Sequence, residues 1–176
     1  MKLSIKDLAY ISLYLALFIV FDYLSNIISL FKMPYGGTLG IGVIVLLVAS
    51  YHLGIKKGIL ITLASVLLQF ITGRVIIVSP YQFVLDYLLA FSVYGIAKLF
   101  PRYQGIIISN LLRYIFHVLS GVIFFKEYAG SKNVIVYSLI YNAGYMIPTL
   151  ILCWLVVPLI VKRIPQSGTQ VPVPIS

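Results

Sequence analysis

The stretch NLLRYIFHVLSGVIFFKEYAGSKNVIVYSLIYN, residues 110–142, decides the fold class and carries much of the candidate site. It predicts one apolar helix, a short polar turn and the start of a second apolar helix, a pattern typical of two neighbouring transmembrane helices. In the first helix His117, Gly121 and Phe125 recur every four residues, so they share one helix face. Polar and small residues therefore interrupt one side of an otherwise apolar helix.

The composition indicates an integral membrane protein. Of the 176 residues, 61% are hydrophobic and 10% charged, with a mean hydropathy of +1.07, whereas soluble domains carry about 25% charged residues. We assign the net charge of +9 to lysines and arginines at helix ends, beside anionic lipid headgroups. The expected partner is therefore the lipid bilayer and not nucleic acid. The first apolar segment lacks a small-residue cleavage site, so we expect a retained helix and not a signal peptide.

The hydrophobic pattern predicts an all-α membrane protein with six transmembrane helices, at residues 6–30, 39–53, 58–72, 80–100, 105–125 and 134–161. The second and third are short for a bilayer that needs about 20 residues per helix. Pro148 and Pro158 predict kinks in the sixth helix. We expect residues 1–164 to form one substrate-binding transmembrane domain and residues 165–176 a flexible tail.

Basic residues at the helix ends predict the orientation. One side of the predicted bundle collects Lys2, Lys6, Lys56, Lys57, Lys98, Arg102, Lys162 and Arg163. The other side collects Lys32, Arg74, Lys126 and Lys132. The richer side is expected to face the cytoplasm, which places both termini inside the cell.

Polar side chains on three helices are predicted to lie at one depth. Asp86 follows the start of its helix by six residues, or about 9 Å at 1.5 Å per residue. His117 and Asn142 each lie eight residues from the same-side end of their helices, or about 12 Å. The residues predicted at this level or just above it are Tyr87, Gly121, Phe125 and Tyr137. Asp22 also interrupts an apolar run, and the sequence leaves open whether it bridges helices or has a function.

A cavity with one carboxylate and several aromatic faces suits a flat ligand that bears positive charge. The carboxylate also suits an amino-heterocycle, from which it can accept hydrogen bonds. Structural roles remain as alternatives: a buried histidine bonded to a carbonyl, an Asn142 that bridges helices, and an ion pair between Asp86 and Arg113. We find no catalytic motif, metal-ligand spacing or glycine-rich phosphate loop, so we expect no catalytic residue, metal or cofactor.

At these residues the sequence resembles the thiamine-specific substrate-binding (S) components of energy-coupling factor (ECF) transporters. The similar blocks are MPYGGT (residues 33–38), LDYLLAFSVYGIA (85–97), LLRYIFHVLSGVIFF (111–125) and YSLIYNAGYMIP (137–148). The resemblance implies a six-helix protein of the bacterial plasma membrane that captures thiamine in a cavity near the outer face. It also implies partners, namely a membrane scaffold (T) subunit and two ATPase subunits that drive uptake.

Carried over by position, the resemblance implies binding roles for eight residues. Asp86 would bind the aminopyrimidine, with Tyr87 beside it. The residues expected around the thiazolium are His117, Gly121 and Phe125, and those expected from the last helix are Tyr137 and Asn142. The loop around Tyr35 would fold over the vitamin.

The chain departs from the family pattern in two respects. In the site, Asp86 stands where some members have the longer glutamate, and Phe125 stands where some have tryptophan, a stronger cation–π partner. The scaffold-docking motif of two alanines four residues apart is incomplete at Ala9, and Ser12 with Ala16 is the expected substitute. The rival hypotheses are an S component for hydroxymethylpyrimidine or riboflavin, and a small intramembrane enzyme or proton-conducting protein that uses Asp86 and His117.

Overall fold

The structure, a computed structural model, describes residues 2–28, 33–34 and 36–165. The elements in chain order are α1 (Ile5–Ile28), α2 (Ile41–Leu53), α3 (Ile55–Ile71), α4 (Pro80–Phe83), the π-helix η1 (Val84–Leu89), α5 (Ala90–Gly95), the 3₁₀ turn η2 (Ala97–Leu99), α6 (Gln104–Phe124), the 3₁₀ turn η3 (Lys126–Ala129) and α7 (Val134–Val161). No strand occurs in the described part of the chain. Because α4, η1 and α5 follow without a break, these residues form six helical segments, which confirms the predicted fold class.

The observed helix boundaries lie within three residues of the predicted ones wherever both fall in described residues. The predicted end of the first helix, at residue 30, lies outside them. The segment predicted as one helix over residues 80–100 differs, because its centre is a π-helix and its end a 3₁₀ turn. The helix α7 continues through Pro148 and Pro158, where the kinks stay a prediction.

Local capping explains where two of the site helices begin. The Ser79 side chain accepts a hydrogen bond from the backbone N–H of Gln82, and Pro80 occupies the first turn, where its missing N–H costs nothing. The Asn133 side chain accepts from the backbone N–H groups of Ile135 and Val136 and so starts α7. These caps fix the register of the helices that carry Asp86 and Asn142.

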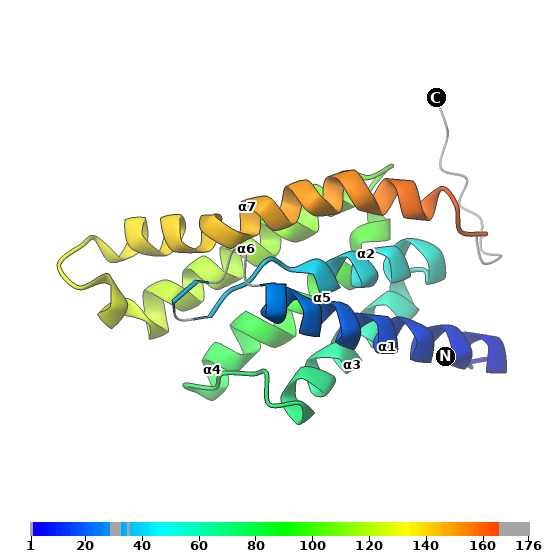
Figure 1. The fold of residues 1–176 in the computed structure, drawn as a ribbon, viewed down its shortest axis with the longest axis horizontal. Coiled ribbons are helices and arrows are strands. Elements are labelled where there is room, and N and C mark those ends of the chain that lie inside the picture. Colours follow the sequence, from blue (N-terminus) through cyan, green and yellow to red (C-terminus); the bar gives the residue numbers. More distant parts are fainter. Residues whose placement is uncertain (1, 29–32, 35, 166–176) are drawn as a thin grey trace.

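The helices pack around α2, which is buried along almost its whole length. It contacts α1, α3, α5 and α7, so its apolar side chains face other helices. The helices α6 and α7 lie alongside each other along one side of the bundle (Figure 1). Glycine permits the closest approach between α3 and α5, since a Cβ at Gly95 would lie 2.6 Å from the backbone nitrogen of Ile59.

Three helices, α1, α6 and α7, are long and apolar enough to cross a membrane by length and composition. The 13-residue α2 is too short to do so alone, and its burial shows that neighbouring helices cover it. The beginning of α1 and the end of α7 lie at the same end of the bundle (Figure 1). Which side of the membrane that end faces stays a prediction.

Candidate functional site

A cavity of about 740 Å³ opens between α1, α3, η1, α6, α7 and the link that joins α1 to α2. Its size falls in the range of ligand pockets, about 300–1,000 Å³. The predicted site residues that line it are Asp86, Tyr87, His117, Gly121, Phe125, Tyr137 and Asn142. The eighth, Tyr35, lies outside the described residues. The structure thus brings together every predicted site residue that it describes.

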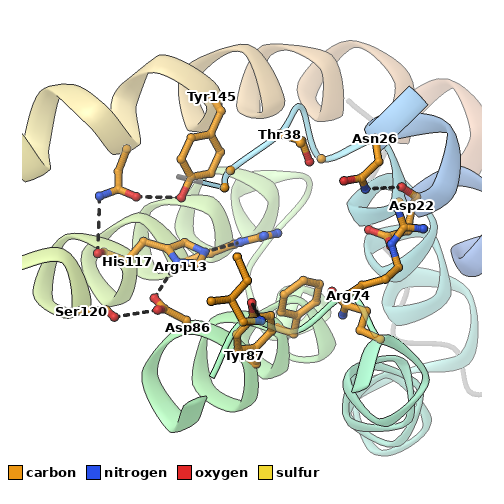
Figure 2. Close-up of a pocket in the computed structure, with 18 of the residues that line it drawn as sticks. Asp22, Asn26, Thr38, Arg74, Asp86, Tyr87, Arg113, His117, Ser120 and Tyr145 are labelled. Carbon is orange, nitrogen blue, oxygen red and sulfur yellow. Dashed lines mark hydrogen bonds and ion pairs between the residues drawn. The ribbon is translucent and has the colours of Figure 1, made fainter. Parts of the chain in front are cut away.

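Asp86 is held by three polar side chains. The His117 Nδ1 lies 2.9 Å from Oδ1, while Gln82 Nε2 and Ser120 Oγ each donate to Oδ2 at 2.7 Å. Figure 2 shows Ser120 and His117 on α6 directed at this carboxylate. An ionised carboxylate offers about four lone-pair sites, so one site on Oδ1 remains for a further donor. Asp86 is therefore fixed in position and still able to accept one hydrogen bond.

Two consecutive residues of the π-helix η1, Asp86 and Tyr87, both line the cavity. Short π-helical segments occur often at functional sites. The Tyr87 hydroxyl accepts a hydrogen bond from the backbone N–H of Ile76 at 2.9 Å. Its ring stacks between those of Phe83 and Phe91, with centroids 5.6 and 6.5 Å away. The aromatic wall beside Asp86 is thus rigid.

Close packing of α6 on α7 forms the next wall. A Cβ at Gly121 would lie 2.2 Å from Ser138 Oγ, so this contact requires glycine. The buried Asn142 donates from Nδ2 to the carbonyls of Ser138, at 2.9 Å, and His117, at 3.4 Å. Its Oδ1 accepts from the Tyr145 hydroxyl at 2.7 Å. Asn142 therefore joins the two helices at the depth of His117.

The link between α1 and α2 is tied to α7. The Tyr141 hydroxyl donates to the carbonyl of Gly36 at 2.7 Å. The Tyr145 ring packs so closely on the link that a Cβ at Gly37 would lie 2.7 Å from its nearest ring carbon. Gly37 also has a φ of +82°, which favours glycine. Further along, the backbone N–H of Gly40 donates to Thr149 Oγ1 at 2.9 Å. The described part of this link thus runs along α7 beside the cavity.

A second acid lies on the opposite side of the cavity (Figure 2). Arg74 Nε lies 3.1 Å from Asp22 Oδ2, and both side chains line the cavity wall. The guanidinium also lies over the Tyr23 ring, 5.2 Å from its centroid, and Asn26 donates to the backbone carbonyl of Asp22 at 2.9 Å. The structure therefore supplies the partner that the sequence could not assign to Asp22.

Comparison with known proteins agrees with this architecture. The family model described as "Thiamine transporter protein" matches residues 8–168. The chain belongs to the thiamine transporter family. It is 31% identical over 167 residues to "Thiamine transporter ThiT" of Bacillus subtilis, an alignment that covers 84% of this chain and 86% of that protein. The protein of the same name from Lacticaseibacillus paracasei is 32% identical over 109 residues, covering 51% and 54%.

The fold matches a solved structure as well. ThiT from Listeria monocytogenes superposes with a TM-score of 0.67 over 85% of this chain and 93% of that one, at 21% identity. Membership of the thiamine transporter family makes the chain a transport protein and not an enzyme. Together with its apolar helices, it makes the chain a multi-pass protein of the bacterial cell membrane.

Sequence reasoning missed several residues of the cavity. Gln82 lies four residues before Asp86, on the same helix face, and Ser120 lies three residues after His117, so helical spacing alone could have found both. Arg113 was considered as a direct partner of Asp86, but its Nε donates to His117 Nε2 at 3.0 Å. His117 thus stands between the two charges. The contact of Tyr145 with the link depends on tertiary packing, which spacing does not encode.

Proposed function

We propose that this protein is the thiamine-binding subunit of an ATP-driven ECF importer and that the described cavity is its vitamin site. The geometry of Asp86 carries the proposal. Among the described residues no lysine or arginine contacts its carboxylate, the side chains of Gln82, His117 and Ser120 orient it, and one lone-pair site of Oδ1 is left for a further donor. This arrangement suits the exocyclic amino group of an aminopyrimidine on a ligand that is positively charged.

Aromatic side chains support the placement of the thiazolium ring. Tyr137 stacks with Tyr141 at 5.8 Å, and Phe125 stacks with Tyr128 at 6.0 Å, in the wall that also holds Gly121. Aromatic faces attract a cation within about 6 Å of the ring centroid. A thiamine bound through Asp86 therefore has its cationic ring directed toward these aromatic groups.

The partners belong to the same proposal. Ala9, Ser12 and Ala16 are exposed on α1, which supports a docking face where small residues let a helix of the scaffold subunit approach closely. The sequence has no glycine-rich phosphate loop, so two ATPase subunits would supply the energy of uptake. Both termini would lie in the cytoplasm, with the vitamin captured from outside.

Isothermal titration calorimetry of the purified protein with thiamine tests the proposal. Calorimetry is preferred to tryptophan fluorescence because the single tryptophan, Trp154, lies outside the cavity lining. We expect saturable one-to-one binding, and much weaker binding of an analogue whose amino group is replaced by a carbonyl oxygen. No heat at micromolar thiamine would refute the proposal. Copurification of ATPase subunits from membranes would test the transporter assembly separately.

A further inference from the structure

A chain of hydrogen bonds connects a buried arginine to the candidate ligand-binding acid. Arg113 Nε donates to His117 Nε2 at 3.0 Å, and His117 Nδ1 lies 2.9 Å from Asp86 Oδ1. Arg113 and His117 are one turn apart on α6, and Asp86 lies across from them on η1. Figure 2 shows the three side chains in sequence along one wall of the cavity.

The first bond determines the protonation of the imidazole. A guanidinium can donate hydrogen bonds but has no acceptor, so the His117 Nε2 that faces it carries no proton. The single proton of the neutral ring is then on Nδ1, where it donates to Asp86. We propose that Arg113 is a positioning residue that holds His117 as the neutral Nδ1–H tautomer, so that Asp86 keeps its negative charge for a cationic ligand. This inference rests on the proposed thiamine site.

Two aromatic rings hold the Arg113 side chain in position. Its guanidinium lies over the Phe91 ring at 4.4 Å and near the Tyr94 ring at 5.5 Å, each measured to the centroid. Its Nη1 is buried with no hydrogen-bond partner among the described residues. The two rings hold the guanidinium in one orientation, in which its Nε faces the imidazole of His117.

The groups that face His117 come from three elements. From η1 it faces Asp86, from its own helix Arg113, and from α7 the Tyr145 ring, with centroids 6.1 Å apart. The Tyr145 hydroxyl donates to Asn142, and Asn142 contacts only the backbone carbonyl of His117. Among these contacts, Arg113 alone occupies the Nε2 lone pair.

Loss of Arg113 would therefore make ligand binding depend on pH. With Nε2 free, His117 can take up a second proton as the pH falls. The resulting imidazolium would neutralise Asp86 and repel the positive ligand. The affinity of such a variant would fall as the pH decreases, whereas the affinity of the wild type would stay nearly constant.

Thiamine titrations between about pH 5.5 and 8 with wild type, Arg113→Met and Arg113→Lys test this role. We expect the affinity of Arg113→Met to fall as the pH decreases from 8 to 5.5, by at most about tenfold per pH unit, because one proton competes with the ligand. Arg113→Lys should restore part of the flat profile, and Arg113→Met/His117→Asn should lose the pH dependence. A flat profile for Arg113→Met, or the same slope in the wild type, would overturn the proposal.

A second measurement needs no ligand, and no variant at Arg113 or His117. The chain has two histidines, so ¹⁵N NMR of labelled wild type gives two sets of imidazole signals, which His52→Gln assigns. We expect His117 to show protonated Nδ1 and unprotonated Nε2 down to about pH 5.5. Protonation of both nitrogens there would overturn the inference. This result stands whether or not thiamine binds, so failure of the proposed function can be told apart from failure of the Arg113 role.

Discussion

The cavity holds two acids on opposite walls, and they are neutralised differently. Asp86 accepts hydrogen bonds from His117, Gln82 and Ser120. Asp22 forms a direct ion pair with Arg74, in which the two side chains are 20% and 19% exposed. The first acid is oriented by an imidazole, an amide and a hydroxyl, while the second is compensated by the guanidinium of Arg74.

This difference shows how a membrane protein can leave one carboxylate available to bind a ligand. A buried charge without a partner is costly. A protein cation in contact with the carboxylate would compensate the negative charge that attracts a positive ligand. Neutral donors lower the cost of burial without cancelling the charge. Asp86 therefore has the surroundings of a binding group, and Asp22 those of a structural link between α1 and the α3–α4 connection.

The largest expected effect on thiamine affinity comes from removing the charge of one acid at a time. We expect Asp86→Asn to weaken thiamine binding about 10- to 150-fold, because a hydrogen bond to a charged group is worth about 1.5–3 kcal/mol. The matched variant Asp22→Asn should change the affinity by less than about fivefold, since a partly exposed ion pair contributes about 0–1 kcal/mol. Calorimetric titration of both variants gives the ratio. Equal losses would contradict the division of roles.

A smaller effect is expected from side chains that hydrogen-bond to neither carboxylate. Tyr145→Phe removes the donor to Asn142 and should weaken thiamine binding by about 2- to 12-fold, the equivalent of about 0.5–1.5 kcal/mol for one hydrogen bond. Asn26→Ala removes the donor to the Asp22 carbonyl and should leave the affinity unchanged. A competition titration against wild type measures both. If Asn26→Ala had the larger effect, the Asp22 wall would be the one that contacts the ligand.

The sequence predicted the surroundings of Asp86 far better than those of Asp22, for a physical reason. Asp86, His117 and Asn142 lie on helices whose spacing and direction follow from hydrophobic periodicity, so their depths could be compared. Asp22 pairs with Arg74, which lies in the connection between α3 and α4. Connections have no fixed period, so nothing in the sequence placed that cation opposite that acid.

Helical periodicity also failed where the helix is not regular. The segment over residues 80–100 was predicted as one helix, yet residues Val84–Leu89 form a π-helix. Asp86 and Tyr87 lie on that segment and both line the cavity. Their place at the cavity follows the prediction, but the π-helical geometry of the segment that carries them was not predicted.

An aromatic substitution near each acid tests which side of the cavity binds the cationic ring. Phe125→Trp should tighten thiamine binding about two- to fivefold, because tryptophan is the stronger cation–π partner and such contacts are worth about 0.5–1 kcal/mol at open sites. The matched change Tyr23→Trp lies under Arg74 and should leave the affinity unchanged. Calorimetry detects this difference, and weaker binding by Phe125→Trp would show that the thiazolium lies elsewhere.

The smallest effect is expected from the Asp22–Arg74 pair itself. A double-mutant cycle with Asp22→Asn, Arg74→Gln and the combined variant should give a coupling of about 0.5–1 kcal/mol in the free energy of unfolding. Thermal unfolding of the purified variants, with and without saturating thiamine, measures it. A structural link predicts the same coupling in both conditions. If thiamine changed the coupling, the ligand would alter the pair directly, and Asp22 would belong to the binding site beside Asp86.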